Sequence, residues 1–253
     1  MSALALSALA ALLMLGGAGV GILLRRSLPQ HHLNEHSKDV VRLGAALLAT
    51  VTALVLGLLI TSAKTTYEAQ RTQVKIIATK LVLLDELLKR YGPEARQARD
   101  LQRQAMLPLV DRIWGQHAVR TASGVPFEPS TEGERVYAAV ESLTPQNEVQ
   151  RNLKFRALAT IEAITESRVL LFEESEAGLP TALLSIVIFW LVILFAGFTL
   201  FSSVNPTSAA ILAVIALSAS GAIFLILEMN DPFGGLMQIS PTPLRQALGA
   251  LGP

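Results

Sequence analysis

The chain has 253 residues, of which 51% are hydrophobic and only 16% charged, and it contains no cysteine. Soluble domains average about 25% charged residues, so this composition is typical of a membrane protein. The absence of cysteine excludes disulfides, thiolate metal sites and a cysteine nucleophile. With 21 basic and 20 acidic residues, the chain lacks the excess of positive charge that nucleic-acid binding needs, so we expect no nucleic-acid partner.

Four apolar runs are long enough to cross a bilayer as helices, which takes about 20 residues each. They cover residues 3–24, 44–63, 179–201 and 207–227. The first run could instead be a cleaved signal peptide, but its apolar stretch is too long and no basic segment precedes it. Residues 202–206 leave room only for a tight turn, which predicts an antiparallel hairpin of the last two spans, with Asn205-Pro206 in the turn. The lipid bilayer is therefore the first expected partner.

Between the second and third spans lies a charged insert, residues 64–178, which we predict to be a helical domain outside the membrane. We expect the second span to continue into it as one rod, because a heptad seam begins there. Gln70 interrupts this seam, whose apolar members we expect to pack the rod or an oligomer: Val74, Ile77, Leu81, Leu84 and Leu88.

Breaker residues divide the rest of the insert. Gly92-Pro93 starts a second helix that we expect to stop near Pro108, and residues 123–133 are typical of a loop. Thr144-Pro145 is expected to open a third helix that ends at about residue 178. The predicted fold is thus all-α with four parts: a transmembrane hairpin (1–63), the insert (64–178), a second hairpin (179–227) and a tail (228–253) with a short amphipathic helix.

Small residues recur every four positions in the second span, at Ala45, Ala49 and Ala53, and the first span has the pair Gly17 and Gly21. Such spacings favour close packing of helices in membranes. A neighbouring face of the second span alternates hydroxyl and apolar groups, which is also compatible with a narrow pore. That face consists of Thr50, Leu54, Gly57 and Thr61. The threonines could alternatively bond back to their own helix.

Histidines cluster at one place, where His31, His32 and His36 lie close to Glu35. Their spacing makes them weak candidates for metal ligands, because the zincin arrangement of two His around a catalytic Glu is missing. No phosphate-binding loop and no nucleophile-base pair accompanies them. We therefore expect neither an enzyme nor a resident metal or cofactor.

Several segments stand out by their exact residues: 36–50 (HSKDVVRLGAALLAT), 55–67 (VLGLLITSAKTTY), 84–86 (LDE), 91–94 (YGPE) and 226–235 (ILEMNDPFGG), followed by Ser240-Pro and Pro243-Leu. Together these segments resemble the bacterial bestrophin-like membrane proteins. The resemblance implies a homo-oligomeric anion channel whose second span lines the pore. It also implies that the insert and both termini face the cytoplasm, in a multi-pass protein of the cell (inner) membrane. This second span departs from the bestrophin pattern, because Ala and Thr replace the usual aromatic and apolar neck residues.

Two functions remain open on this reading. The first is an oligomeric channel that conducts ions along the face of Thr50 and Leu54. The alternative is a non-conducting membrane scaffold or sensor that acts through the heptad seam of the insert. The positive-inside rule does not decide the orientation, since basic residues flank the spans on both sides.

Overall fold

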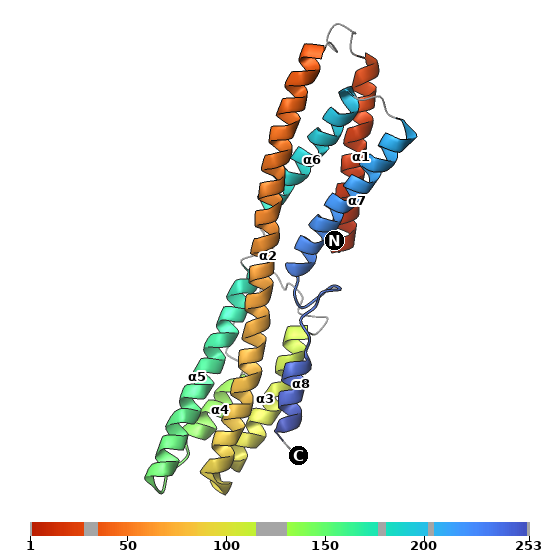
Figure 1. The fold of residues 1–253 in the computed structure, drawn as a ribbon. Helices are drawn as coiled ribbons and strands as arrows, with labels where there is room; N and C mark the ends of the chain where they lie inside the picture. The colour runs from red at the N-terminus through yellow and green to blue at the C-terminus, as the bar shows by residue number, and fades with distance from the viewer. Residues whose placement is uncertain (1, 28–34, 115–130, 177–180, 202–204, 252–253) are drawn as a thin grey trace. The chain divides into compact units, whose positions relative to one another are not determined.

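The computed structural model of the chain describes residues 2–27, 35–114, 131–176, 181–201 and 205–251 (Figure 1). Every regular element in these residues is helical, as the apolar periodicity predicts. Contacts divide the chain into two compact units. The first comprises residues 1–66, 178–231 and 235–237, and the second comprises 67–177, 232–234 and 238–253.

The four predicted spans are all helical, and their helices are long and apolar enough to cross a membrane. They are α1 (Ala3–Ser27), α2 (Glu35–Tyr91), α6 (Thr181–Phe201) and α7 (Pro206–Met229). The continuation of the second span into the insert is confirmed, because α2 runs for 57 residues without a break. α7 begins at Pro206, where the side chains of Asn205 and Ser208 form a capping box, so the helix start predicted at Asn205-Pro206 is confirmed, whereas residues 202–204 of the predicted turn lie outside the described residues.

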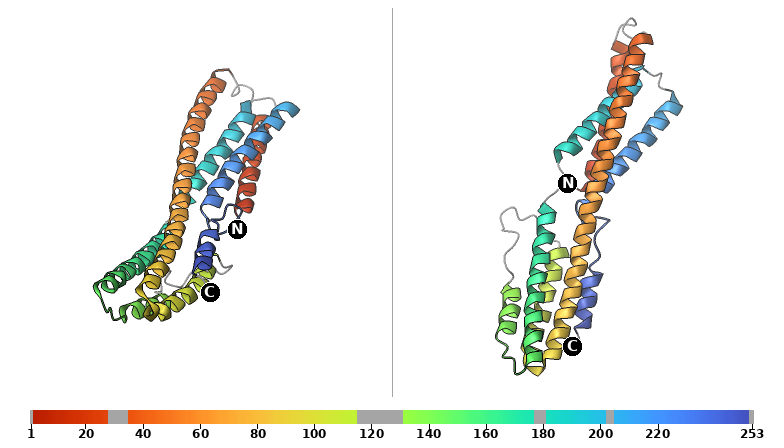
Figure 2. Two further views of the ribbon diagram at one scale, coloured as in Figure 1. Left: turned by 60° about the horizontal axis from the view of Figure 1, so that its bottom comes forward. Right: turned by 60° about the vertical axis from the view of Figure 1, so that its left-hand side comes forward.

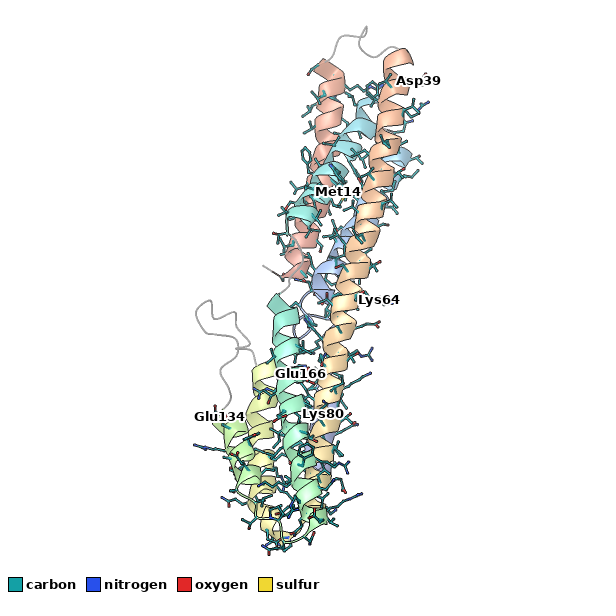
Figure 3. The ribbon with its side chains drawn as sticks, turned by 90° about the vertical axis from the view of Figure 1, so that its left-hand side faces the viewer. Met14, Asp39, Lys64, Lys80, Glu134 and Glu166 are labelled. Atoms are coloured by element: carbon teal, nitrogen blue, oxygen red, sulfur yellow. The ribbon has the colours of Figure 1, made fainter. Side chains whose placement is uncertain are left out.

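In the first unit, α1 packs against both α6 and α7 (Figures 1 and 2). A Cβ atom on Gly17 would lie 2.6 Å from the Val192 carbonyl oxygen, and one on Gly21 would overlap the Ala196 carbonyl oxygen. Only glycine permits such a close approach of two backbones. This close approach produces an apolar core between the helices, and Met14 of α1, labelled in Figure 3, is fully buried in it.

Two hydroxyl groups bridge these helices. The Thr199 hydroxyl on α6 donates to the Ala18 carbonyl oxygen at 2.8 Å, and the Ser220 hydroxyl on α7 donates to the Ser7 carbonyl oxygen at 2.7 Å. Both bonds are buried. In hydrocarbon an unpaired hydroxyl is costly, so these pairs also set how α1 is placed along its two neighbours.

The segment after α7 folds back on the end of that helix. The buried carboxylate of Glu228 accepts hydrogen bonds from the backbone N–H groups of Leu236 and Met237, at 2.6 and 3.1 Å. Gly235 has φ 69°, in the left-handed region that glycine adopts without strain. Glu228 therefore holds a turn, which accounts for an acidic residue at the end of an apolar helix.

The second unit contains the rest of α2, a 3-10 turn (Pro93–Ala95), α3 (Arg96–Trp114), α4 (Thr131–Glu141), α5 (Glu148–Glu176) and α8 (Thr242–Ala250). All five members of the predicted seam, Val74 to Leu88, are buried in its core. Residues of α5 such as Ile161 and Ile164 belong to the same core. In Figure 3, α5 can be found by the label of Glu166. The tail joins it as well, with Leu244, Ala247 and Leu251 buried.

The tail is held to α3 by one aromatic side chain. The indole N–H of Trp114 donates to the Ile239 carbonyl oxygen at 2.7 Å, and its ring meets that of Phe233 edge to face at 5.7 Å. The apolar face of the predicted C-terminal helix thus docks on its own chain, a point that the sequence left open.

Three predicted boundaries inside the insert are wrong. α3 passes Pro108 and ends at Trp114, because its packing against α4 and α8 offsets the one hydrogen bond that proline removes. α4 begins at Thr131, within the predicted loop, and Gly133 lies in its first turn, where a glycine costs little. α5 begins at Glu148 because the Asn147 side chain accepts the Gln150 N–H at 2.8 Å, and asparagine caps a helix better than Thr144 does.

Two α5 side chains close the ends of neighbouring helices. Gln150 donates to the Tyr91 carbonyl oxygen at 3.0 Å, at the end of α2. Lys154 donates to the carbonyl oxygens of Glu141 and Leu143, at 2.6 and 2.9 Å. The Tyr91 and Glu141 carbonyls are at the last residues of α2 and α4, and Leu143 lies just after α4. α5 therefore satisfies carbonyl groups that the ends of these helices leave unpaired.

A forked ion pair joins α2 to α3. The Arg99 guanidinium donates to both carboxylate oxygens of Asp85, at 2.7 and 3.2 Å. The two side chains are 31% and 10% exposed, and the hydrogen bond to Asp85 raises the pKa of Arg99 further above its ordinary value. The Arg99 guanidinium therefore stays charged at every physiological pH, and its two hydrogen bonds to Asp85 stabilise the contact of the two helices.

We predict that Gly21→Ala lowers the melting temperature of the purified protein. The new methyl group meets the Ala196 carbonyl oxygen, and such overpacking costs about 1–3 kcal/mol. Gly16→Ala is the matched control, since no atom lies within 4 Å of a Cβ at that position and alanine favours the helix by about 0.5–1 kcal/mol. Equal melting temperatures for the two variants in detergent would contradict the packing described.

A second prediction concerns the forked pair. Asp85→Ala leaves the Arg99 guanidinium without its partner in a half-buried position, so we expect the free energy of unfolding to fall by about 1–3 kcal/mol. Glu148→Ala removes an exposed partner of Arg151 and should cost below about 0.5 kcal/mol. Denaturant titration followed by circular dichroism measures both, and a loss at Glu148 as large as that at Asp85 would refute the prediction.

Candidate functional site

The membrane-spanning stretch of α2 has one buried side. Thr52, Leu59 and Ala63 are buried, while Ala45 and Ala49 are half-buried. The first three residues are spaced seven and four apart, which places them along one line of a helix. This line is the buried side of α2 in the first unit.

The residues singled out as a possible pore face lie on the opposite side. Thr50, Leu54, Gly57 and Thr61 are all exposed in the single chain, and Leu54 is 70% exposed. At 3.6 residues per turn, their mean direction is about 170° from that of the buried line. Nothing lies within 4 Å of a Cβ atom placed on Gly57. No part of the described chain covers this face.

The two threonine hydroxyls on this face bond to their own helix. Thr50 donates to the Ala46 carbonyl oxygen at 2.9 Å, and Thr61 donates to the Gly57 carbonyl oxygen at 2.8 Å. Their protons are occupied in this conformation, but each oxygen keeps lone pairs directed outwards. The face is therefore polar and uncharged at Thr50 and Thr61, which lie on either side of Leu54 along the helix. Leu54 is the large apolar side chain of this face.

The other residues named from the sequence lie elsewhere. Ala53 is exposed, next to the exposed face, whereas Gly17 and Gly21 are buried against α6. The seam of the insert lies in the core of the second unit. His31 and His32 fall outside the described residues, and only the backbone of His36 is described. Among the described residues, no three His, Asp or Glu side chains come together as metal ligands.

Sequence reasoning missed Thr52 and Leu59, which mark the covered side of α2. The spacing of these two residues with Ala63, seven and then four, was a usable signal. The small residues at every fourth position form a more regular pattern in the sequence and hide this spacing. A strict spacing of four drifts around a helix by about 40° per step, so the line from Ala45 to Gly57 moves from the covered side to the exposed side.

Comparison with known proteins gives a consistent picture. The model of the bestrophin-like domain matches residues 11–244. Two solved structures of variants of a bacterial bestrophin homologue from Klebsiella pneumoniae have the same fold, each with a TM-score of 0.72. One is 14% identical and matched over 97% of each chain. The other is 15% identical and matched over 99% of this chain and 97% of its own.

No curated protein matches the chain. The identities to the solved structures are low, so those structures show a shared fold of membrane helices and a helical bundle rather than a shared activity. The family assignment depends on the domain model, which covers nearly the whole length. This chain therefore belongs to the bestrophin-like family.

Proposed function

We propose that the protein is a homo-oligomeric ion channel in which the exposed face of α2 lines the pore. The observation that carries the proposal is the two-sidedness of α2 within the first unit: Thr52, Leu59 and Ala63 are covered, whereas Thr50, Leu54, Gly57 and Thr61 are open. Membership of the bestrophin-like family supports it.

One chain cannot enclose a pore with a single face of one helix. Several copies arranged around a rotation axis can, because each contributes the same face and the ring closes without free edges. The outward lone pairs of Thr50 and Thr61 then meet water instead of lipid, which removes the cost of placing them in hydrocarbon. Gly57 leaves room between them, and Leu54 forms a ring of apolar side chains.

A ring of leucine side chains in an otherwise polar channel is a narrow apolar segment from which water is readily expelled. Constrictions of this kind gate ion flow by dewetting. The polar positions carry no charge, so the face itself does not select strongly between ions. We assign anions as the conducted class on the family resemblance, and we place the second unit and both termini in the cytoplasm of a cell whose inner membrane holds the channel.

The scaffold alternative loses its main support in this structure. The seam of Val74, Ile77 and Leu81 was its expected partner surface, yet these side chains are buried among α3, α5 and α8 of the same chain. Charged substitutions there would unfold the bundle rather than release a partner. The exposed face of α2 in the first unit, which carries threonine hydroxyls, therefore remains the better candidate for a functional surface.

The first test uses the absence of cysteine in the chain. In lipid nanodiscs, we expect Leu54→Cys to react with a membrane-impermeant, charged thiol reagent, because a pore brings water to that position. The matched control is Leu217→Cys on α7. Leu217 is 67% exposed in the single chain, close to the 70% of Leu54.

In the proposed assembly Leu217 faces lipid, so its thiol should react at least about tenfold more slowly, since the charged reagent does not enter hydrocarbon. Mass spectrometry of the labelled protein measures both rates. Equal rates, or a faster reaction at Leu217→Cys, would refute the assignment of the pore face.

The second test measures current. In planar bilayers we expect Leu54→Thr to increase the single-channel conductance or the open probability several-fold, because a polar ring no longer expels water. Leu217→Thr makes the same chemical change outside the pore and should leave both quantities unchanged. If an intact oligomer of the unaltered protein carries no current in chloride, sodium or potassium salts, the proposed function is wrong.

A further inference from the structure

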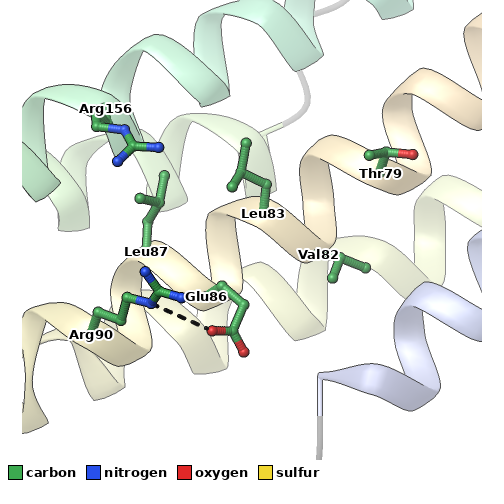
Figure 4. A pocket seen from close by; sticks show the side chains of 7 residues that line it. All are labelled: Thr79, Val82, Leu83, Glu86, Leu87, Arg90 and Arg156. Carbon is green, nitrogen blue, oxygen red and sulfur yellow. Dashed lines mark ion pairs between the residues drawn. The ribbon is translucent and has the colours of Figure 1, made fainter.

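The second unit has a groove on its surface between α2 and α5. It has a volume of about 330 Å³ and is lined by seven residues (Figure 4): Thr79, Val82, Leu83, Glu86, Leu87, Arg90 and Arg156. Six of them come from three turns of α2, and Arg156 comes from α5. All seven belong to the second unit.

One wall of the groove is apolar. Leu87 and Val82 both line the groove. Leu87 is otherwise buried and Val82 is half-buried. Leu83 is 43% exposed, and it is the one large apolar side chain that α2 exposes between residues 67 and 91, all of which the structure describes. An apolar ligand that covers Leu83 would remove this surface from water, which is favourable by about 25 cal/mol per Å² of apolar surface.

The rim of the groove carries more positive than negative charge. Arg90 makes a long ion pair with Glu86, 3.8 Å between the Arg90 Nε and the carboxylate oxygen. Arg156 has no hydrogen-bond or ion-pair partner among the described residues. Two guanidinium groups and one carboxylate therefore border an apolar wall, and this favours an occupant with a negative charge.

The size of the groove narrows the class of occupant. Its volume lies at the lower end of the range of small-molecule sites, roughly 300–1,000 Å³. A partner helix, about 10–12 Å across with its side chains, does not fit into it. The groove suits a short apolar chain that ends in an anionic group.

We propose that this groove binds a small amphiphilic carboxylate. The alkyl part lies on Val82, Leu83 and Leu87, and the carboxylate pairs with the free guanidinium of Arg156. A planar guanidinium donates two parallel hydrogen bonds to a carboxylate, which is the strongest pairing open to Arg156 at this surface. This site is separate from the proposed pore face and does not depend on ion conduction.

The test uses two single-cysteine variants of the full-length protein in lipid nanodiscs. Thr79→Cys places a thiol in the groove, and Thr72→Cys places one two turns earlier on α2, outside the groove. The two threonines are matched, since both are exposed and each donates to the carbonyl oxygen four residues before it. A neutral maleimide reacts with each thiol, and mass spectrometry measures the rate.

Hexanoate, acetate and 1-hexanol are the three probes. We expect hexanoate at millimolar concentration to slow the reaction at Thr79→Cys several-fold and to leave Thr72→Cys unchanged. Acetate lacks the alkyl chain and hexanol lacks the charge, so both should protect less. Added Arg156→Gln should raise the hexanoate concentration for half-protection by about tenfold or more, the loss expected for a charge-assisted hydrogen bond. Arg151→Gln, an exposed residue of α5 outside the groove, is the control.

Three outcomes would overturn the proposal. One is the absence of protection by hexanoate at Thr79→Cys. Another is equal protection by hexanoate and hexanol, or protection that Arg156→Gln leaves unchanged, since either removes the role of the charge. The third is a thiol at Thr79→Cys that is already shielded without any probe in the assembled protein but reacts in separated subunits, because a second copy of the chain would then occupy the groove.

Discussion

The structure of the first unit depends on the requirement that every backbone polar group in hydrocarbon be satisfied within its own helix. Helices that meet this requirement have no hydrophobic force to drive them together in lipid, and they associate only where side chains allow close contact. Gly17 and Gly21 provide that contact between α1 and α6, and the Thr199 hydroxyl fixes it with a bond to α1, while the Ser220 hydroxyl bonds α7 to α1. The membrane unit of one chain is thus organised around α1.

The same requirement explains why α2 is left partly uncovered. Its own hydrogen bonds are complete, and its exposed threonines donate to its own carbonyl oxygens, so the helix is stable in the membrane with one side free. Because the covered line and the open face lie on opposite sides, the open face is available to face an axis shared by several copies. Assembly is therefore the step that we propose to create the pore, while the single chain supplies one wall of it.

In the second unit, which we propose to lie in water outside the membrane, the balance of forces changes. The heptad seam of α2 is driven into the core by apolar burial, and the ends of the helices are completed by polar side chains of α5, chiefly Gln150 and Lys154. Charged residues that do not enter such pairs remain at the surface. Arg156 is one of these, and its position beside Leu83 gives the unit a groove with both an apolar and a cationic side.

The sequence by itself determined the membrane class, the four helices that can span the membrane and the unbroken length of α2, because apolar length and helical spacing are local properties of the chain. The face of Thr50 and Leu54 is a prediction from the same spacing. It misplaced the helix ends at Pro108, Gly133 and Thr144, where neighbouring helices or a better cap outweigh the local preference of one residue. Only the tertiary structure decided which side of α2 is covered, that the seam and the tail pack inside one chain, and that Arg156 and Leu83 line one groove. Each of these depends on contacts between residues far apart in the chain, and the spacing within one helix can mark a face for packing without showing what packs against it.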